Sequence, residues 1–172
     1  MALDLKQRSL VAFEALSALD MSALLARARE LQAWQGAGTA QATVGQQALR
    51  GKKLGLLCGP ADDHDAQLFT RAANALGAHV ATLRPCLSTV STAAEVQRTA
   101  RVLGRLYDAL DCVGMPHELV MRIGADAGVP VFEGLASAGH PAHRLARVLG
   151  AEVDTEGLRC VVIQAVLLGV LL

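Results

Sequence analysis

The sequence predicts an α/β fold, a parallel sheet of about four strands with helices on both faces. Two observations support this prediction. Short apolar runs alternate with longer stretches of helical periodicity, a pattern that gives right-handed crossovers between parallel strands. Apolar residues make up 52% of the 172 residues and charged residues only 19%, so the chain can bury a sizeable core and is not expected to be disordered.

An amphipathic helix is predicted at 20–35, with arginines on the face opposite its apolar residues. The apolar face consists of Leu24, Leu25, Ala28 and Leu31. Asp20 or Ser22 can cap this helix through its side-chain oxygen. The stretch 35–51 is rich in Gly, Ala and Gln, which indicates a connector.

The alternating part of the chain follows this connector. The predicted strands are 53–58, 79–84, 109–113 and 129–132. The predicted helices between them are 66–77, 93–106 and 117–127. Two more helices are expected at 141–149, where Pro141 takes the first helical position, and at 156–171.

The last apolar run, "CVVIQAVLLGVLL", has thirteen residues and contains Gln164, whereas a membrane-spanning helix needs about twenty apolar residues. We therefore expect helix 156–171 to pack on the domain, against helix 20–35. Its expected packing face is Val162, Ala165, Val166 and Gly169. No membrane partner is expected.

Charge and composition argue against nucleic-acid binding. The formal net charge is zero and no long basic run occurs, so the chain lacks the positive surface that nucleic acids or anionic membranes attract. Aromatic residues make up only 3%, which leaves few side chains for stacking on bases.

The cysteines indicate a reducing compartment. The chain contains Cys58, Cys86, Cys112 and Cys160. They form no CxxC pair, and "MALDLKQRSL" lacks the apolar core of a signal peptide. We expect reduced, mostly buried thiols in a cytoplasmic protein, in preference to a disulfide framework.

An acidic turn follows the first predicted strand, in "LLCGPADDHDAQLF". Its charged or titratable residues are Asp62, Asp63, His64 and Asp65. Ligands of open α/β sheets bind at the carboxyl ends of strands, here 58–66, 113–117 and 133–140. Two carboxylates ~4 Å apart repel by about 4 kcal/mol at an effective dielectric constant of about 20, so a phosphate dianion is disfavoured at this turn. The simpler interpretation is helix capping by these aspartates.

Four stretches together resemble a known family. They are "LRGKKLGLLCGPADDHDAQLFTRAANALGAHVATL", "TARVLGRLYDAL", "VPVFEGLASAGHPAHRLARVLG" and "EVDTEGLRCVVIQAVLLGVLL". They are similar to the first strand–loop–helix, the Thr-Ala-Arg-Val-Leu helix, the His-Pro-x-Gln segment and the C-terminal helix of ornithine and aspartate carbamoyltransferases. The resemblance implies a carbamoyl-phosphate-binding-like domain at 1–150 and a returning C-terminal helix in 151–172, without the amino-acid-binding domain.

The resemblance also implies that the phosphate site is altered. The family binds phosphate with Ser-Thr-Arg-Thr-Arg, and the matching residues here are Asp62, Asp63, His64, Asp65 and Ala66. Val113 takes the place of a further arginine, and His143 replaces the glutamine of the motif that begins with His140. Arg159 matches the C-terminal arginine that contacts carbamoyl phosphate. The loop matching 86–95, which reaches a neighbouring subunit in the family, lacks its usual polar groups.

Three functions remain open at this point. The first is a non-catalytic scaffold or regulatory subunit, in a homotrimer or a hetero-oligomer with a related subunit, with no cofactor. The second is a ligand-binding module, with oxygen and imidazole donors suited to a divalent metal. Its donors would be Asp62, Asp63, His64, Asp65, His140 and His143. The third is a residual carbamoyltransferase, which would lack the cations that stabilise transition-state charge.

Overall fold

A four-stranded parallel sheet forms the centre of the protein, with the strands in the order β2-β1-β3-β4. The computed structural model describes residues 17–37, 46–59, 63–149 and 156–172. The strands are β1 (Lys53–Cys58), β2 (His79–Leu83), β3 (Ala109–Val113) and β4 (Val131–Phe132). The predicted fold class is confirmed.

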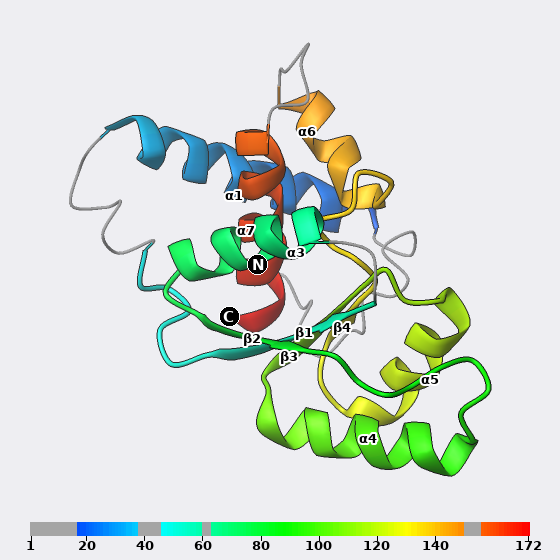
Figure 1. Cartoon of the computed structure of the whole chain (residues 1–172). Coiled ribbons are helices and arrows are strands. Elements are labelled where there is room, and N and C mark those ends of the chain that lie inside the picture. The colour runs from blue at the N-terminus through cyan, green and yellow to red at the C-terminus, as the bar shows by residue number, and fades with distance from the viewer. Residues whose placement is uncertain (1–16, 38–45, 60–62, 150–155) are drawn as a thin grey trace.

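Helices cover both faces of this sheet. They are α1 (Ala18–Ala37), α3 (Asp63–Ala75), α4 (Ala93–Leu106), α5 (His117–Ala127), the 3₁₀ helix η2 (Pro141–His143), α6 (Arg144–Val148) and α7 (Glu156–Leu171). Figure 1 shows α1, α3 and α7 on one side of the sheet and α4 and α5 on the other. The predicted α/β layering therefore holds for the described residues.

Alternate side chains of β1 enter two separate hydrophobic cores. Leu54 and Leu56 pack with α1, α3 and α7. Leu57 points the other way and packs with α4 and α5. Successive residues of a strand point to opposite faces, so β1 reads as a continuous apolar run because both of its faces are buried.

Helix α7 is buried around its whole circumference. Residues 161–170 are all buried, and α7 contacts α1, α3 and α6. The expected packing against the first helix is therefore confirmed, but it is not limited to one face of α7. Among the described helices, none is both long and apolar enough to cross a lipid bilayer.

Two helix starts differ from the prediction because of local capping. Ser17 caps α1, since its hydroxyl accepts the amide hydrogen of Asp20 and the Asp20 carboxylate accepts that of Ser17. The predicted caps Asp20 and Ser22 lie inside the helix. Helix α3 begins at Asp63 rather than at 66, because carboxylates are favoured in the first turn of a helix.

Two later elements are shorter than predicted. The fourth strand starts at Val131 because Pro130 has no amide hydrogen to donate, although its carbonyl accepts the amide of Leu110 at 2.9 Å. The predicted helix 141–149 is split into η2 and α6. The connector 35–51 ends in a turn at 46–51, while 38–45 lie outside the described residues.

Gly104 permits the close packing of α4 on α5, and we predict that adding a methyl group there destabilises the fold. A Cβ at this position would lie 1.7 Å from the carbonyl oxygen of Ala127. Gly104→Ala should lower the free energy of unfolding by about 2–3 kcal/mol in urea denaturation. Gly157→Ala is the matched control, because its Cβ meets no atom within 4 Å. Equal stability of the two variants would contradict the close approach.

Candidate functional site

The residues predicted for the site gather around the first turn of α3, the end of β3, η2 and the start of α7. Of these residues, Val113, His140 and His143 are buried, Asp65, Ala66 and Arg159 are half-buried, and His64 is exposed. Asp62 and the side chain of Asp63 lie outside the described part of the chain. The structure thus brings the described members of the predicted set to one side of the sheet, on the segments that the resemblance implied.

An ion pair between Asp65 and Arg159 lies at the centre of this region. The Arg159 Nη2 atom is 3.0 Å from Asp65 Oδ1 and also donates to the carbonyl oxygen of Ala136. The two charged side chains are only 13% and 11% exposed. The pair therefore joins α3, α7 and the loop after β4, and it neutralises the arginine with a carboxylate from the same chain.

His140 is neutral at physiological pH. Burial, with a smaller contribution from His143, lowers the pKa of His140 to about 4. Its Nδ1 atom accepts the amide hydrogen of Ala142 at 3.2 Å, and the two histidine rings meet edge to face with centroids 6.5 Å apart. His140 can therefore offer hydrogen bonds but no positive charge near pH 7.

Backbone contacts hold the carboxyl ends of β1 and β3 together. The amide of Gly59 donates to the carbonyl of Val113 at 2.8 Å. A Cβ on Gly59 would lie 2.4 Å from the carbonyl oxygen of Gly114, so only glycine fits this approach. Val113, which the resemblance equates with an arginine of the family, is thus an apolar, buried residue under a tight turn.

A crevice of about 300 Å³ lies at these strand ends, between β1 and β3. This is the topological switch point, where open α/β sheets bind ligands. Its walls are mainly apolar, with Pro85, Leu87, Met115 and Leu119. Arg84 is the only charged side chain among the described lining residues. One cation at the rim is fewer than a phosphate site ordinarily uses.

The metal hypothesis gains no support from the described residues. None of their His, Cys, Asp and Glu side chains form a group of three or more that could hold a metal ion. Asp65 is paired with Arg159, and His140 is turned toward the Ala142 amide. A metal site that uses Asp62 and Asp63 stays a prediction, because those side chains lie outside the described part.

Sequence reasoning missed Asp111, a fully buried carboxyl group in the centre of β3. Its Oδ1 atom accepts the amide hydrogen of Leu135 at 3.0 Å, and its Oδ2 atom has no hydrogen-bond partner among the described residues. Burial, with a smaller contribution from the charge of Asp65, raises the pKa of Asp111 to about 7. The sequence feature that could have indicated a buried carboxyl group is the single aspartate within the apolar run "ALDCV".

The four cysteines form no disulfide with one another, but the expectation that they are mostly buried is wrong. Cys112 is buried, Cys58 and Cys160 are half-buried, and Cys86 is exposed. Burial raises the pKa of the Cys112 and Cys160 thiols, which keeps both protonated and unreactive near neutral pH.

Known carbamoyltransferases share this arrangement of elements. An ornithine carbamoyltransferase of Actinobacillus pleuropneumoniae serotype 5b (strain L20) is 36% identical over 149 residues, which cover 87% of this chain and 43% of that protein. The solved ornithine carbamoyltransferase of Pyrococcus furiosus matches with a TM-score of 0.70 and 28% identity, over 84% of this chain and 45% of the other.

This chain resembles one domain of the ornithine and aspartate carbamoyltransferases. An aspartate transcarbamoylase of Trypanosoma cruzi, solved with N-(phosphonacetyl)-L-aspartic acid, matches in fold with a TM-score of 0.66, at 21% identity over 86% of this chain and 45% of the other. The carbamoyltransferase-like chain spans less than half the length of the relatives it matches, on their N-terminal part. No family model matches the sequence.

The buried Asp65–Arg159 ion pair should contribute more to the free energy of unfolding than the exposed Arg71–Glu156 pair, which joins the same two helices. Asp65→Asn leaves the Arg159 guanidinium without its counter-charge, so we expect the free energy of unfolding to fall by about 2–4 kcal/mol in urea denaturation. The control is Glu156→Gln, which removes an α3–α7 ion pair with Arg71 whose side chains are 46% and 57% exposed. That change should leave stability nearly unaltered.

A double variant tests whether the effect comes from the pair itself. Asp65→Asn combined with Arg159→Gln should cost less than the sum of the two single changes, because the second change removes the unpaired charge. Additive losses would show that the two side chains act independently.

Asp111 should make stability fall as pH rises from about 4 to about 7. The unfolded group loses its proton near pH 3.8 and the folded group near pH 7, so the folded state binds more protons between these values. The stabilisation by protonated Asp111 is complete below the pKa of the group in the unfolded chain, about 3.8. It is lost as the pH rises past the pKa of the group in the folded protein, about 7.

Asp111→Asn removes this titration, and we expect it to raise the free energy of unfolding at pH 8 by about 1–3 kcal/mol relative to the unmodified protein. The two proteins should converge at pH 4. Urea denaturation at both pH values measures this, and parallel pH profiles would contradict the raised pKa.

Proposed function

We propose that this protein is a non-catalytic carbamoyltransferase-like subunit that serves as a scaffold or regulatory partner. The Asp65–Arg159 ion pair is the observation that supports this most directly. By resemblance, Arg159 matches the arginine that contacts carbamoyl phosphate. A carboxylate of the same chain already satisfies that arginine, so an incoming phosphate would have to displace a paired, half-buried group.

The remaining site offers little to replace that contact. His140 is neutral near pH 7, and Val113 supplies no charge. A hydrogen bond to a charged group contributes roughly 1.5–3 kcal/mol, so the loss of the two arginines of the family's phosphate motif weakens ground-state binding by several orders of magnitude. The same cations would stabilise charge in the transition state, which is usually the largest catalytic contribution.

An oligomeric, cytoplasmic protein is part of this proposal. In the family, the loop matching 86–95 reaches a neighbouring subunit. Here Val90 in that loop is 90% exposed, and Leu106 on α4 is 56% exposed. Large apolar side chains left in solvent are typical of surfaces that contact another chain. We propose that a second copy or a related subunit covers them, in a homotrimer or a hetero-oligomer.

Calorimetry with carbamoyl phosphate at pH 7 and low salt tests the loss of the substrate site. We expect no heat of binding up to millimolar concentration, and no turnover with ornithine or aspartate, because the arginine is already paired and the phosphate motif is acidic. A full-length ornithine carbamoyltransferase is the positive control. Micromolar binding would overturn the proposal and support the residual-enzyme alternative.

Light scattering on the same sample tests the assembly. We expect a mass that is a multiple of the 18.0 kDa chain. A stable monomer at micromolar concentration would restrict the proposal to a hetero-oligomer, and a monomer that also fails to bind any related subunit would refute it.

A further inference from the structure

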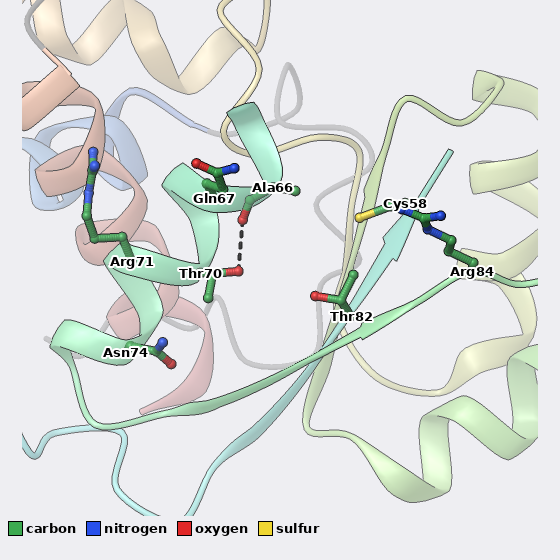
Figure 2. A pocket seen from close by; sticks show the side chains of 8 residues that line it. All are labelled: Cys58, Ala66, Gln67, Thr70, Arg71, Asn74, Thr82 and Arg84. Atoms are coloured by element: carbon green, nitrogen blue, oxygen red, sulfur yellow. Dashed lines mark hydrogen bonds between the residues drawn. The ribbon is translucent and has the colours of Figure 1, made fainter. Parts of the chain in front are cut away.

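A second cleft lies between α3 and β2, beside the altered phosphate site. It has a volume of about 570 Å³. Figure 2 shows Gln67, Thr70 and Asn74 on the α3 side and Thr82 and Arg84 on the β2 side. Clefts of roughly 300–1,000 Å³ commonly hold small organic molecules, so this one is too large for a single inorganic ion.

The described lining of this cleft is cationic. It contains two arginines and no carboxylate. Arg71 donates to Glu156 of α7 at 2.7 Å, and Figure 2 shows its side chain turned away from β2. Arg84 makes no ion pair or hydrogen bond with any described residue. Its guanidinium group is therefore available to an anion, with five donors in a planar fork that matches a carboxylate.

Polar groups surround this free cation. The Thr70 hydroxyl donates to the carbonyl of Ala66 at 2.8 Å, which leaves its oxygen free to accept. Thr82 lies across the cleft from Thr70 and is exposed (Figure 2). The amide side chain of Asn74 adds both a donor and an acceptor. The cleft can thus bind a molecule that combines one anionic group with hydrogen-bonding groups.

We propose that the cleft between α3 and β2 binds a small polar organic acid. Its carboxylate contacts the Arg84 guanidinium, and its other polar groups contact Thr70, Thr82 and Asn74. A planar, bidentate acceptor suits the single guanidinium better than a tetrahedral phosphate, which usually needs several cations or a helix N-terminus. The proposed acid-binding site uses neither Asp65 nor Arg159, although Ala66 of the altered motif lines the cleft and Arg84 also lines the crevice at the strand ends.

Amide NMR titration of the full chain with succinate tests this proposal. We expect saturable shifts at residues 66–74 and 82–84, with a dissociation constant of about 10 mM or tighter for one charged contact and a few hydrogen bonds. Succinamide has the same carbon skeleton without charge and should cause no saturable shift. Inorganic phosphate should bind more weakly than succinate, and tighter phosphate binding would overturn the assignment to a carboxylate.

Variants of exposed residues separate the charged contact from general effects. Arg84→Gln should weaken succinate binding about tenfold, and Thr82→Val about two- to fivefold. Arg101→Gln on α4, whose side chain is 61% exposed on the other side of the sheet, is the matched control and should leave the affinity unchanged. The amide spectra report whether each variant is folded. Equal affinity of Arg84→Gln and the unmodified protein would overturn the proposal.

Discussion

A parallel sheet has apolar side chains on both faces, and α1, α3 and α7 together cover one of them in this protein. Ten consecutive residues of α7 are buried, which means that α1, α3 and α6 must surround it. The chain leaves the sheet after β4 and returns to it through α7, so one terminal segment completes a core that begins at α1. The position of α7 in turn places Arg159 beside the first turn of α3. The geometry of the altered site therefore follows from the need to cover the sheet.

At the edge of this core, the ion pair between Arg159 and Asp65 joins α7 to α3. Taking two charges out of water costs free energy, and their attraction offsets that cost only when geometry and further hydrogen bonds are good. The Ala136 carbonyl supplies such a bond. An internal carboxylate also has an advantage over any free anion, because it loses no translational freedom on binding. A phosphate bound to Arg159, as the resemblance implies, would therefore have to displace a carboxylate that is already in place.

Periodicity predicted the elements well where local sequence and tertiary burial agree. The ranges 53–58 and 109–113 are strands as predicted, because their side chains alternate between two cores. The predicted strand 129–132 is shortened because Pro130 has no amide hydrogen to donate, and the predicted helix 141–149 begins with the 3₁₀ turn Pro141–His143. The Asp65–Arg159 pair joins residues 94 positions apart, so no local pattern could show it. The resemblance placed both residues near one ligand but did not indicate that they would bind each other.

Asp111 links the electrostatics of the site to proton binding. It lies between Ala109 and Val113 on the strand face that packs against α3 and α7, and the charge of Asp65 contributes to its raised pKa. While Asp111 keeps its proton, the charges of Asp65 and Arg159 cancel and His140 adds none. When Asp111 loses its proton above pH 7, these four groups carry a net negative charge. A phosphate-binding site needs a net positive charge. Above pH 4, where His140 is neutral, the net charge of these four groups is zero or negative. By the resemblance, acidic residues stand in place of the phosphate motif, and above pH 7 the Asp111 carboxylate adds to the negative charge that disfavours an anionic substrate.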